Sequence, residues 1–311
     1  MLSRRNIRVK VMQMLYSYNR DRRLTLNELL TKYNESVRKS YELYLFNVQY
    51  LISIAEYSVK DAGARKVRLL PNEEDKLFTP KLFENECIQS LVKNEALQAE
   101  LKKYVLSSRT NAELVRSFYA DFSKHEDYKK YWLNPETTTD DTVTAILNLY
   151  KFLINNELYS ETMEDNYYWW ADDESLVVGA MKKTIKALPN NDKFWEEFQP
   201  QAEHVKEFGE TVLRQVFLGE NELLRMIEPI LRNWSIDRVA AVDMAMIQMA
   251  LCEFMYCPTV PPKVTINEYV ELSKHYSTED SREFINGILD KLLKKLDREG
   301  KVYKEGRGLM E

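Results

Sequence analysis

The chain has 311 residues, of which only 8 are Gly and 9 are Pro. Because β-hairpins, βα loops and phosphate-binding turns depend on glycine at positive φ, this composition argues against Rossmann, TIM-barrel and all-β folds. Hydrophobic residues make up 44% of the chain and charged residues 30%, which supplies ample apolar material for a folded core. We therefore expect an all-α protein.

The cysteines and histidines argue against a metal centre. Cys87, Cys252 and Cys257 form no CxxC pair, and no His-x-x-x-His spacing accompanies them. A sparse, odd cysteine count fits a reducing compartment. The longest apolar stretch, residues 239–252, is interrupted by Asp243 and is too short to span a bilayer. We expect a cytoplasmic protein without a metal.

The net charge of −5 is unevenly distributed along the chain. Residues 1–23 carry a net charge of +6 and residues 291–311 carry +3, so the remainder carries −14. A basic arm on an acidic body is typical of contact with a polyanion. The alternative is a first helix whose charges are simply solvated, and charge alone leaves both interpretations open.

Capping boxes and polar breaks divide the chain into helices with little strand signal between them. Thr25, Thr110 and Thr265 each stand three positions before a Glu, the spacing of a capping box. Pro200 is a candidate break, and the tail from Gly300 is expected to be mobile. The expected helices cover residues 4–19, 25–60, 81–105, 111–131, 140–159, 173–188, 192–232, 236–256, 265–275 and 279–298.

The first predicted helix has two different faces. At 100° per residue, Ile7 and Val11 share an apolar face, whereas Arg5, Arg8 and Tyr16 lie on roughly the opposite side. Guanidinium groups bind phosphate bidentately, and an aromatic ring can stack on an unpaired base. The pattern fits an RNA-binding helix docked on a bundle, and it equally fits a helix with Tyr16 packed at its boundary.

The last third of the chain is the most informative. Residues 238–256 are apolar nearly all round, which is typical of a central core helix. In the final helix we expect Gly287 to mark a close backbone approach, because glycine within a helix costs about 1 kcal/mol against alanine. The apolar stripe of that helix consists of Ile285, Ile288, Leu289, Leu292 and Leu296.

Three segments of this region, 263–272, 277–281 and 284–291, closely resemble the C-terminal signature of the bacterial transcription antitermination factor NusB family. Residues 205–256 also resemble that family. The amino terminus, Arg4-Arg5-Asn6-Ile7-Arg8 through Ser17, is similar to its arginine-rich first helix, although Asn6 stands where the family often has a third arginine.

The resemblance implies an all-helical protein of two packed helical subdomains with no catalytic activity. Such proteins bind the boxA element of nascent ribosomal-operon leader RNA together with NusE, a small-subunit ribosomal protein, and thereby help RNA polymerase to resist termination. The resemblance places Asp280 and Phe284 near the RNA and partner surface of the last helices. The positions that match the RNA-contacting first helix are Arg4, Arg5, Arg8 and Tyr16.

A large segment departs from the compact family members, which lack most of residues 21–204. We expect four parts: a basic first helix (1–20), a helical insertion (21–204), a NusB-like subdomain (205–298) and a mobile tail (299–311). The insertion contains Tyr167-Tyr168-Trp169-Trp170, and four adjacent aromatics in a helix cannot all be buried on one face. Core packing, a protein-docking patch and base stacking are all open for them.

Enzymatic function finds little support in the motifs. The chain contains no GxGxxG and no GxxxxGK[ST], and its three histidines are widely spaced with no nucleophile motif nearby. We expect no catalysis and no cofactor. The leading hypothesis is an RNA-binding antitermination factor acting on single-stranded boxA-type RNA with NusE. The alternative is a helical protein-interaction scaffold that has lost RNA binding, and an RNA-modifying enzyme with a NusB-like module is the weakest of the three.

Overall fold

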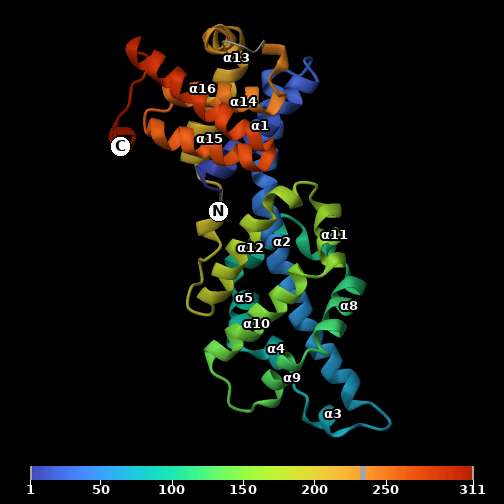
Figure 1. The fold of residues 1–311 in the computed structure, drawn as a ribbon. Helices are drawn as coiled ribbons and strands as arrows, with labels where there is room; N and C mark the ends of the chain where they lie inside the picture. The colour runs from blue at the N-terminus through green and yellow to red at the C-terminus, as the bar shows by residue number, and fades with distance from the viewer. Residues whose placement is uncertain (1, 232–235, 310–311) are drawn as a thin grey trace. The chain divides into compact units, whose positions relative to one another are not determined.

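The computed structural model describes residues 2–231 and 236–309 (Figure 1). All regular structure in these two ranges is helical, so the expectation of an all-α protein is confirmed. The described chain forms two compact units. One comprises residues 38–199, which we call the extension unit. The other comprises residues 2–37 and the chain from Pro200 onward, which we call the terminal unit.

The extension unit is built around the long helix α2 (Leu26–Lys66), whose residues from Arg38 onward belong to it. In this unit α10 lies against α5, α9 and α12. The other elements are α3 (Glu73–Leu77), α4 (Lys81–Glu84), α5 (Glu86–Lys93), α6 (Glu95–Lys103), α7 (Leu106–Arg109), α8 (Ala112–Phe122), α9 (Glu126–Leu133), α10 (Thr139–Ile154), α11 (Glu157–Asn166), α12 (Trp170–Ala187) and the 3-10 turn η1 (Glu196–Phe198).

The core of the extension unit is rich in tyrosine, and several of the buried hydroxyl groups form hydrogen bonds within the core. The buried Asn47 on α2 accepts hydrogen bonds from Tyr150 Oη at 3.2 Å and Tyr159 Oη at 2.8 Å. Its amide donates in turn to the Leu43 carbonyl at 2.9 Å. Buried phenols with hydrogen-bond partners fix the relative position of helices more specifically than apolar contact alone.

Several predicted helices are divided by asparagine. The expected helix 81–105 is interrupted where Asn85 and Asn94 cap α5 and α6, each accepting a hydrogen bond from the backbone N–H three residues on. The expected helix 140–159 ends at Ile154, and Asn156 caps the next helix in the same way. Because the short Asn side chain bonds the backbone locally, it favours a new start over continuation.

The terminal unit is organised around α14 (Ala241–Tyr256), which packs against α1 (Arg4–Arg20), α13 (Thr211–Ile227), α15 (Pro262–Tyr276) and α16 (Glu279–Arg298). Eleven of its residues are buried, so the prediction of a central core helix is confirmed. The predicted stripe of α16 is buried as expected. The remaining elements are the π-helix η2 (Glu203–Glu210) and the 3-10 turns η3 (Glu228–Ile230), η4 (Ile236–Arg238) and η5 (Gly306–Leu309).

The boundaries between the two units differ from the expected 20/21 and 204/205. They fall at 37/38 and 199/200 because the start of α2 packs with η2. Tyr33 of α2 is fully buried, and its hydroxyl donates to the Val205 carbonyl at 2.9 Å. A Cβ on Gly209 would lie 1.9 Å from that hydroxyl oxygen. The expectation of a close approach at Gly287 is wrong, since a Cβ there would meet nothing within 4 Å. Close approaches occur at Gly209 and at Gly308, where a Cβ would lie 1.8 Å from the Pro258 carbonyl oxygen.

The described part of the tail is anchored, in contrast to the expected mobile segment 299–311. Lys304 Nζ donates to the carbonyls of Glu253 and Cys257, both at 2.9 Å, at the C-terminal end of α14. The Glu305 amide donates to the Pro258 carbonyl at 3.1 Å. A cation suits this position because the last carbonyls of a helix lack partners within it.

Two sequence expectations involve residues outside the described ranges. Residue 232 ends the expected helix 192–232, and residues 310–311 end the expected tail. Within the described ranges, none of the helices combines the length and the apolar character that crossing a membrane requires.

Candidate nucleic-acid interface

Helix α1 is more deeply buried than its two-faced pattern predicts. Ile7 and Val11 are fully buried, as expected for the apolar face. Lys10 and Met12 are buried as well, because α1 packs against η2, α13 and α14 on different sides. The helix is therefore an integral part of the terminal unit rather than an arm lying on its surface.

Arg8 lies in the interior of this unit. Its Nε and Nη2 donate to Glu253 Oε1 and Oε2 at 2.8 and 2.7 Å, and the two side chains are 2% and 0% exposed. The guanidinium also stacks against the Phe208 ring, with Cζ 5.0 Å from the centroid. Burial lowers the pKa of Arg8, but the charge and hydrogen bonds of Glu253 outweigh it and raise that pKa above its ordinary value.

Glu253 is the centre of a closed polar network. Besides Arg8, it accepts hydrogen bonds from Thr265 Oγ1 at 3.1 Å and from Tyr269 Oη at 2.5 Å. Burial, followed by the charge of Glu253, raises the pKa of Tyr269 well above its usual range, so the phenol stays a donor. The prediction that Arg8 lies on the outer face of α1 is wrong: both edges of its guanidinium are enclosed, and the residue joins α1 to α14 and α15.

Arg5 is the arginine that remains at the surface. Its side chain is 54% exposed, and its Nε and Nη2 donate to Glu268 Oε2 and Oε1, both at 2.8 Å. Arg8 Nη1 lies 3.5 Å from the same Glu268 Oε2, so the structure brings these two arginines together. The hydrogen bonds from Arg5 lower the pKa of Glu268. Arg5 Nη1 takes no part in either bond and remains available for a second acceptor.

Arg4 is only a quarter exposed. Its Nη2 donates to Glu203 Oε1 at 3.0 Å and to Thr259 Oγ1 at 3.2 Å. Its Cζ lies 5.7 Å from the centroid of the Phe208 ring. These contacts tie the first turn of α1 to η2 and to the loop after α14, and they leave less of Arg4 accessible than the sequence suggests.

Tyr16 is half-buried and forms a pair with Arg20 on the same helix. Arg20 Nε donates to Tyr16 Oη at 3.2 Å, and its Cζ lies 5.4 Å from the centroid of the ring. Arg20 is exposed. A guanidinium stacked on a phenol is a recognised platform for phosphate and base contact. The i,i+4 spacing of the two residues could have indicated this pair, which the helical-wheel argument missed.

Asp280 and Phe284 lie on the first turns of α16. Asp280 is exposed and Phe284 is half-buried. The buried Ser281 between them donates to Asp243 Oδ2 at 2.7 Å, which holds this end of α16 against α14. Four of the six predicted positions, Arg4, Arg5, Arg8 and Tyr16, lie on α1, and the other two lie on α16.

Most of the positive charge of the N-terminal segment is neutralised within the terminal unit. Beyond the pairs of Arg4, Arg5 and Arg8, Arg22 pairs with Glu220 at 2.6 Å and Arg23 with Asp21 at 2.8 Å. The free cationic surface implied by the net charge of +6 is therefore much reduced. Among the exposed arginines of this segment, Arg5, Arg22 and Arg23 are oriented by carboxylates, whereas Arg20 is oriented by Tyr16.

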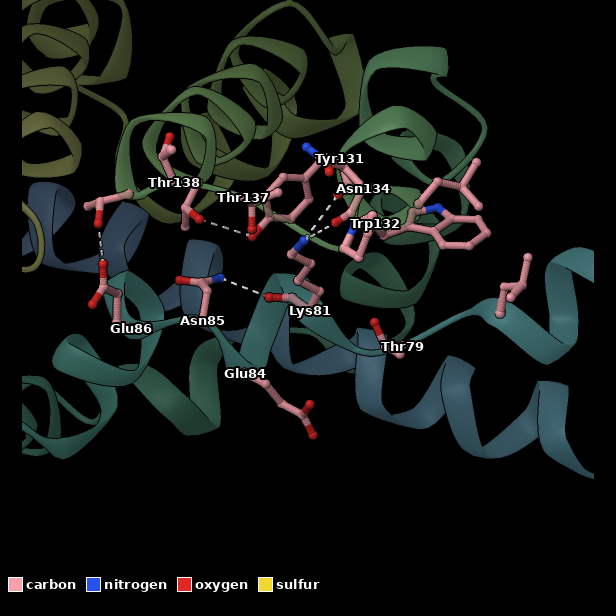
Figure 2. A pocket seen from close by; sticks show the side chains of 15 residues that line it. Thr79, Lys81, Glu84, Asn85, Glu86, Tyr131, Trp132, Asn134, Thr137 and Thr138 are labelled. Carbon is pink, nitrogen blue, oxygen red and sulfur yellow. Dashed lines mark hydrogen bonds between the residues drawn. The ribbon is translucent and has the colours of Figure 1, made fainter.

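A cavity of about 900 Å³ lies in the extension unit between α4, α5, α9 and α10 (Figure 2). Figure 2 shows Lys81 pointing at the end of α9, where its Nζ donates to the Asn134 carbonyl at 2.5 Å, and burial lowers its pKa. Thr139 donates to Glu86 across the opening. No three His, Cys, Asp or Glu side chains in the described ranges form a metal-binding group. Tyr131 and Thr142, which also line the cavity, share a hydrogen bond of 3.4 Å between their hydroxyl groups.

The described residues thus define an all-helical protein whose first helix is joined to a C-terminal bundle by oriented arginine–glutamate pairs. Residues 178–294 match the model of the NusB family. The chain is 38% identical over 105 residues to the transcription antitermination protein NusB of Salinibacter ruber (strain DSM 13855 / M31), covering 34% of this chain and 66% of that protein, just under two thirds.

Two further relatives are covered more fully. The chain is 41% identical over 101 residues to the transcription antitermination protein NusB of Methylacidiphilum infernorum (isolate V4), covering 32% of this chain and 70% of that protein. It is 37% identical over 114 residues to the transcription antitermination protein NusB of Desulfatibacillum aliphaticivorans, covering 37% of this chain and 79% of that protein. No solved structure matches the chain. The chain belongs to the NusB family, and the resemblance seen in its sequence is confirmed.

Proposed function

We propose that this protein is a transcription antitermination factor that binds single-stranded boxA-type RNA together with NusE. Membership of the family supports the class of function. The observation that carries the RNA contact is Arg5, an exposed guanidinium held at the surface of α1 and α15 by two hydrogen bonds to Glu268. A carboxylate that fixes one edge of an arginine reduces the entropy lost when the other edge binds phosphate.

Arg5 and Arg20 anchor phosphates in this proposal, and Tyr16 supports Arg20 through its ring and hydroxyl. Arg4 contributes weakly because it is largely covered, and Arg8 acts only through the fold. Asp280 and Phe284 line the part of the surface shared with NusE. Base edges are read mainly at that shared surface, because two exposed arginines provide too few contacts for sequence discrimination by themselves.

The test is an anisotropy titration of a boxA-containing RNA and a scrambled RNA, with and without NusE, at several salt concentrations. We expect tighter binding to boxA, strengthened by NusE. Arg5→Ala should weaken binding and reduce the slope of log K against log salt by about one. The matched control is Arg214→Ala, which removes a comparably exposed arginine paired with Glu210 on the same unit.

Weak binding that is blind to sequence and unaffected by NusE would contradict the proposal and favour the protein-interaction scaffold. A salt slope that stays unchanged in Arg5→Ala would remove Arg5 from the interface. Arg8→Ala is unsuitable for this test because its loss perturbs the fold as well as the charge.

A further inference from the structure

The four consecutive aromatics at 167–170 separate into two buried anchors and two rings between them. Tyr167 donates from its hydroxyl to Glu42 Oε1 at 3.0 Å, and Trp170 donates from Nε1 to Ser160 Oγ at 2.9 Å. Both anchors are almost fully buried. They fix the turn that joins α11 to α12.

Tyr168 and Trp169 occupy this fixed turn. Tyr168 is 79% exposed and Trp169 is half-buried, and their ring centroids are 4.5 Å apart with planes tilted by 40°. Both line a small pocket of about 40 Å³ that also includes Leu43. Tyr and Trp side chains held rigidly at a surface are typical of residues that dominate a protein interface, because little entropy is lost on binding.

The chain segment that carries these rings is acidic. Residues 152–181 contain seven Asp and Glu and no Lys, Arg or His. Asp165 stands three positions before Tyr168, and Asp172 stands three positions after Trp169. The extension unit as a whole has 21 Lys and Arg against 27 Asp and Glu, a net charge of −6. A polyanion such as RNA is disfavoured here, whereas a cationic segment is favoured.

Cations do approach this site from α2 and α7, but they converge on a buried carboxylate. Lys39 lines the pocket, and its Nζ lies 3.1 Å from Glu42 and 5.5 Å from the centroid of the Tyr167 ring. Arg38 and Arg109 pair with the same Glu42 at 3.1 and 2.5 Å. All seven carboxylates of residues 152–181 lie on α11 and α12, the two helices that this turn joins.

We propose that Tyr168 and Trp169 form a docking surface for an arginine- or lysine-bearing segment of a partner protein. A guanidinium or ammonium group over the two rings gains a cation–π interaction, and the surrounding carboxylates attract the rest of the segment. This surface belongs to the extension unit and is independent of the RNA contact proposed for α1.

The test is an anisotropy titration of a fluorescein-labelled hexa-arginine peptide with the full chain. Tyr168→Ala and Trp169→Ala are each expected to weaken binding roughly three- to tenfold. Tyr168→Phe keeps the ring and should bind like the wild type. The matched control is Tyr303→Ala, which removes a tyrosine that is also largely exposed but lies in the terminal unit. The affinity of Tyr303→Ala for the peptide should equal that of the wild type.

The proposal is overturned if the wild type does not bind the peptide measurably, or if both ring variants bind it as well as the control does. A parallel titration with labelled oligo(U) distinguishes peptide docking from RNA binding. If the ring variants lose oligo(U) binding while their affinity for the peptide is unchanged, the two rings stack on bases and the docking proposal is wrong. Thermal melting checks that each variant is folded. Tyr168→Ala decides the outcome should Trp169→Ala fail to fold, because Tyr168 is the more exposed ring.

Discussion

The hydroxyl oxygen of Tyr33 lies 1.9 Å from the position that a Cβ on Gly209 would occupy. Gly209→Ala should therefore force Tyr33 to move and break its hydrogen bond to Val205, with an expected destabilisation of about 1–3 kcal/mol. Urea unfolding measures the effect. The control is Gly219→Ala in α13, where a Cβ meets nothing within 4 Å and the higher helix propensity of alanine should stabilise by about 0.5–1 kcal/mol. Equal effects at the two positions would contradict the steric explanation.

The buried pair of Arg8 and Glu253 predicts a large cost for removing either partner alone. Arg8→Ala should leave the carboxylate unpaired in the interior and destabilise by about 3–5 kcal/mol. The double variant Arg8→Met with Glu253→Met should lose less stability than the sum of the losses in Arg8→Met and Glu253→Met alone. Arg23→Ala removes a highly exposed surface pair with Asp21 and should reduce the free energy of unfolding far less, because solvent screens the pair. A loss that small for Arg8→Ala would rule out the interior ion pair.

The pKa of Glu268 predicts a defined pH dependence. Hydrogen bonds from Arg5 hold this pKa below the usual value of about 4.3. A carboxyl whose pKa is lowered by folding contributes stability above the unfolded value, and that contribution disappears as the pH falls through the folded value. The stability difference between the wild type and Glu268→Gln should therefore be constant at pH 5–8 and shrink below about pH 4. Urea midpoints at a series of pH values measure it. A difference that persists unchanged at pH 2 would contradict the assignment.

From the hydrogen bonds of Lys304 we expect the tail to contribute measurably to the stability of the protein. Lys304→Met removes two hydrogen bonds to the last carbonyls of α14, at an expected cost of about 1–3 kcal/mol. Amide hydrogen exchange across residues 299–309 should become faster, because the Lys304 anchor is lost. Lys301→Met is the control, since the Lys301 side chain pairs with the exposed Glu299 at 2.8 Å. Unchanged exchange in Lys304→Met would show that the tail is held by other contacts.

The elements that were predictable from the sequence are those with a strong local signal. Helix α16 runs from Glu279 to Arg298 as expected, because its apolar stripe follows the helical period without interruption. The limits of α1 agree to within one residue for the same reason. The asparagine caps that divide the expected helices are a local signal too, but one that competes with the high helix propensity of the residues around them.

The residues that sequence reasoning placed wrongly depend on contacts between distant parts of the chain. A helical wheel considers the residues of α1 alone and therefore assigns Arg8 to the outer face. In the structure Arg8 is buried and pairs with Glu253, which is 245 positions away in the sequence. The close approach at Gly209, which was not predicted from the sequence, likewise depends on Tyr33, which lies on another helix. Arg5 was placed correctly at the surface, but its carboxylate partner on α15 could not be found from spacing alone.

Arg8 and Glu253 lie 245 positions apart in the sequence, and this distance has a consequence for synthesis of the chain. At about 5–20 residues per second, the carboxylate emerges from the ribosome roughly 12–50 seconds after the guanidinium. The whole of residues 38–199 is translated in that interval and can fold while α1 still lacks its partners. The first helix made is therefore among the last to be buried. A nascent chain stalled before α14 would lack Glu253 and Glu268, and it would display Arg5 and Arg8 without these partners to whatever polyanion is nearby, the ribosomal RNA included.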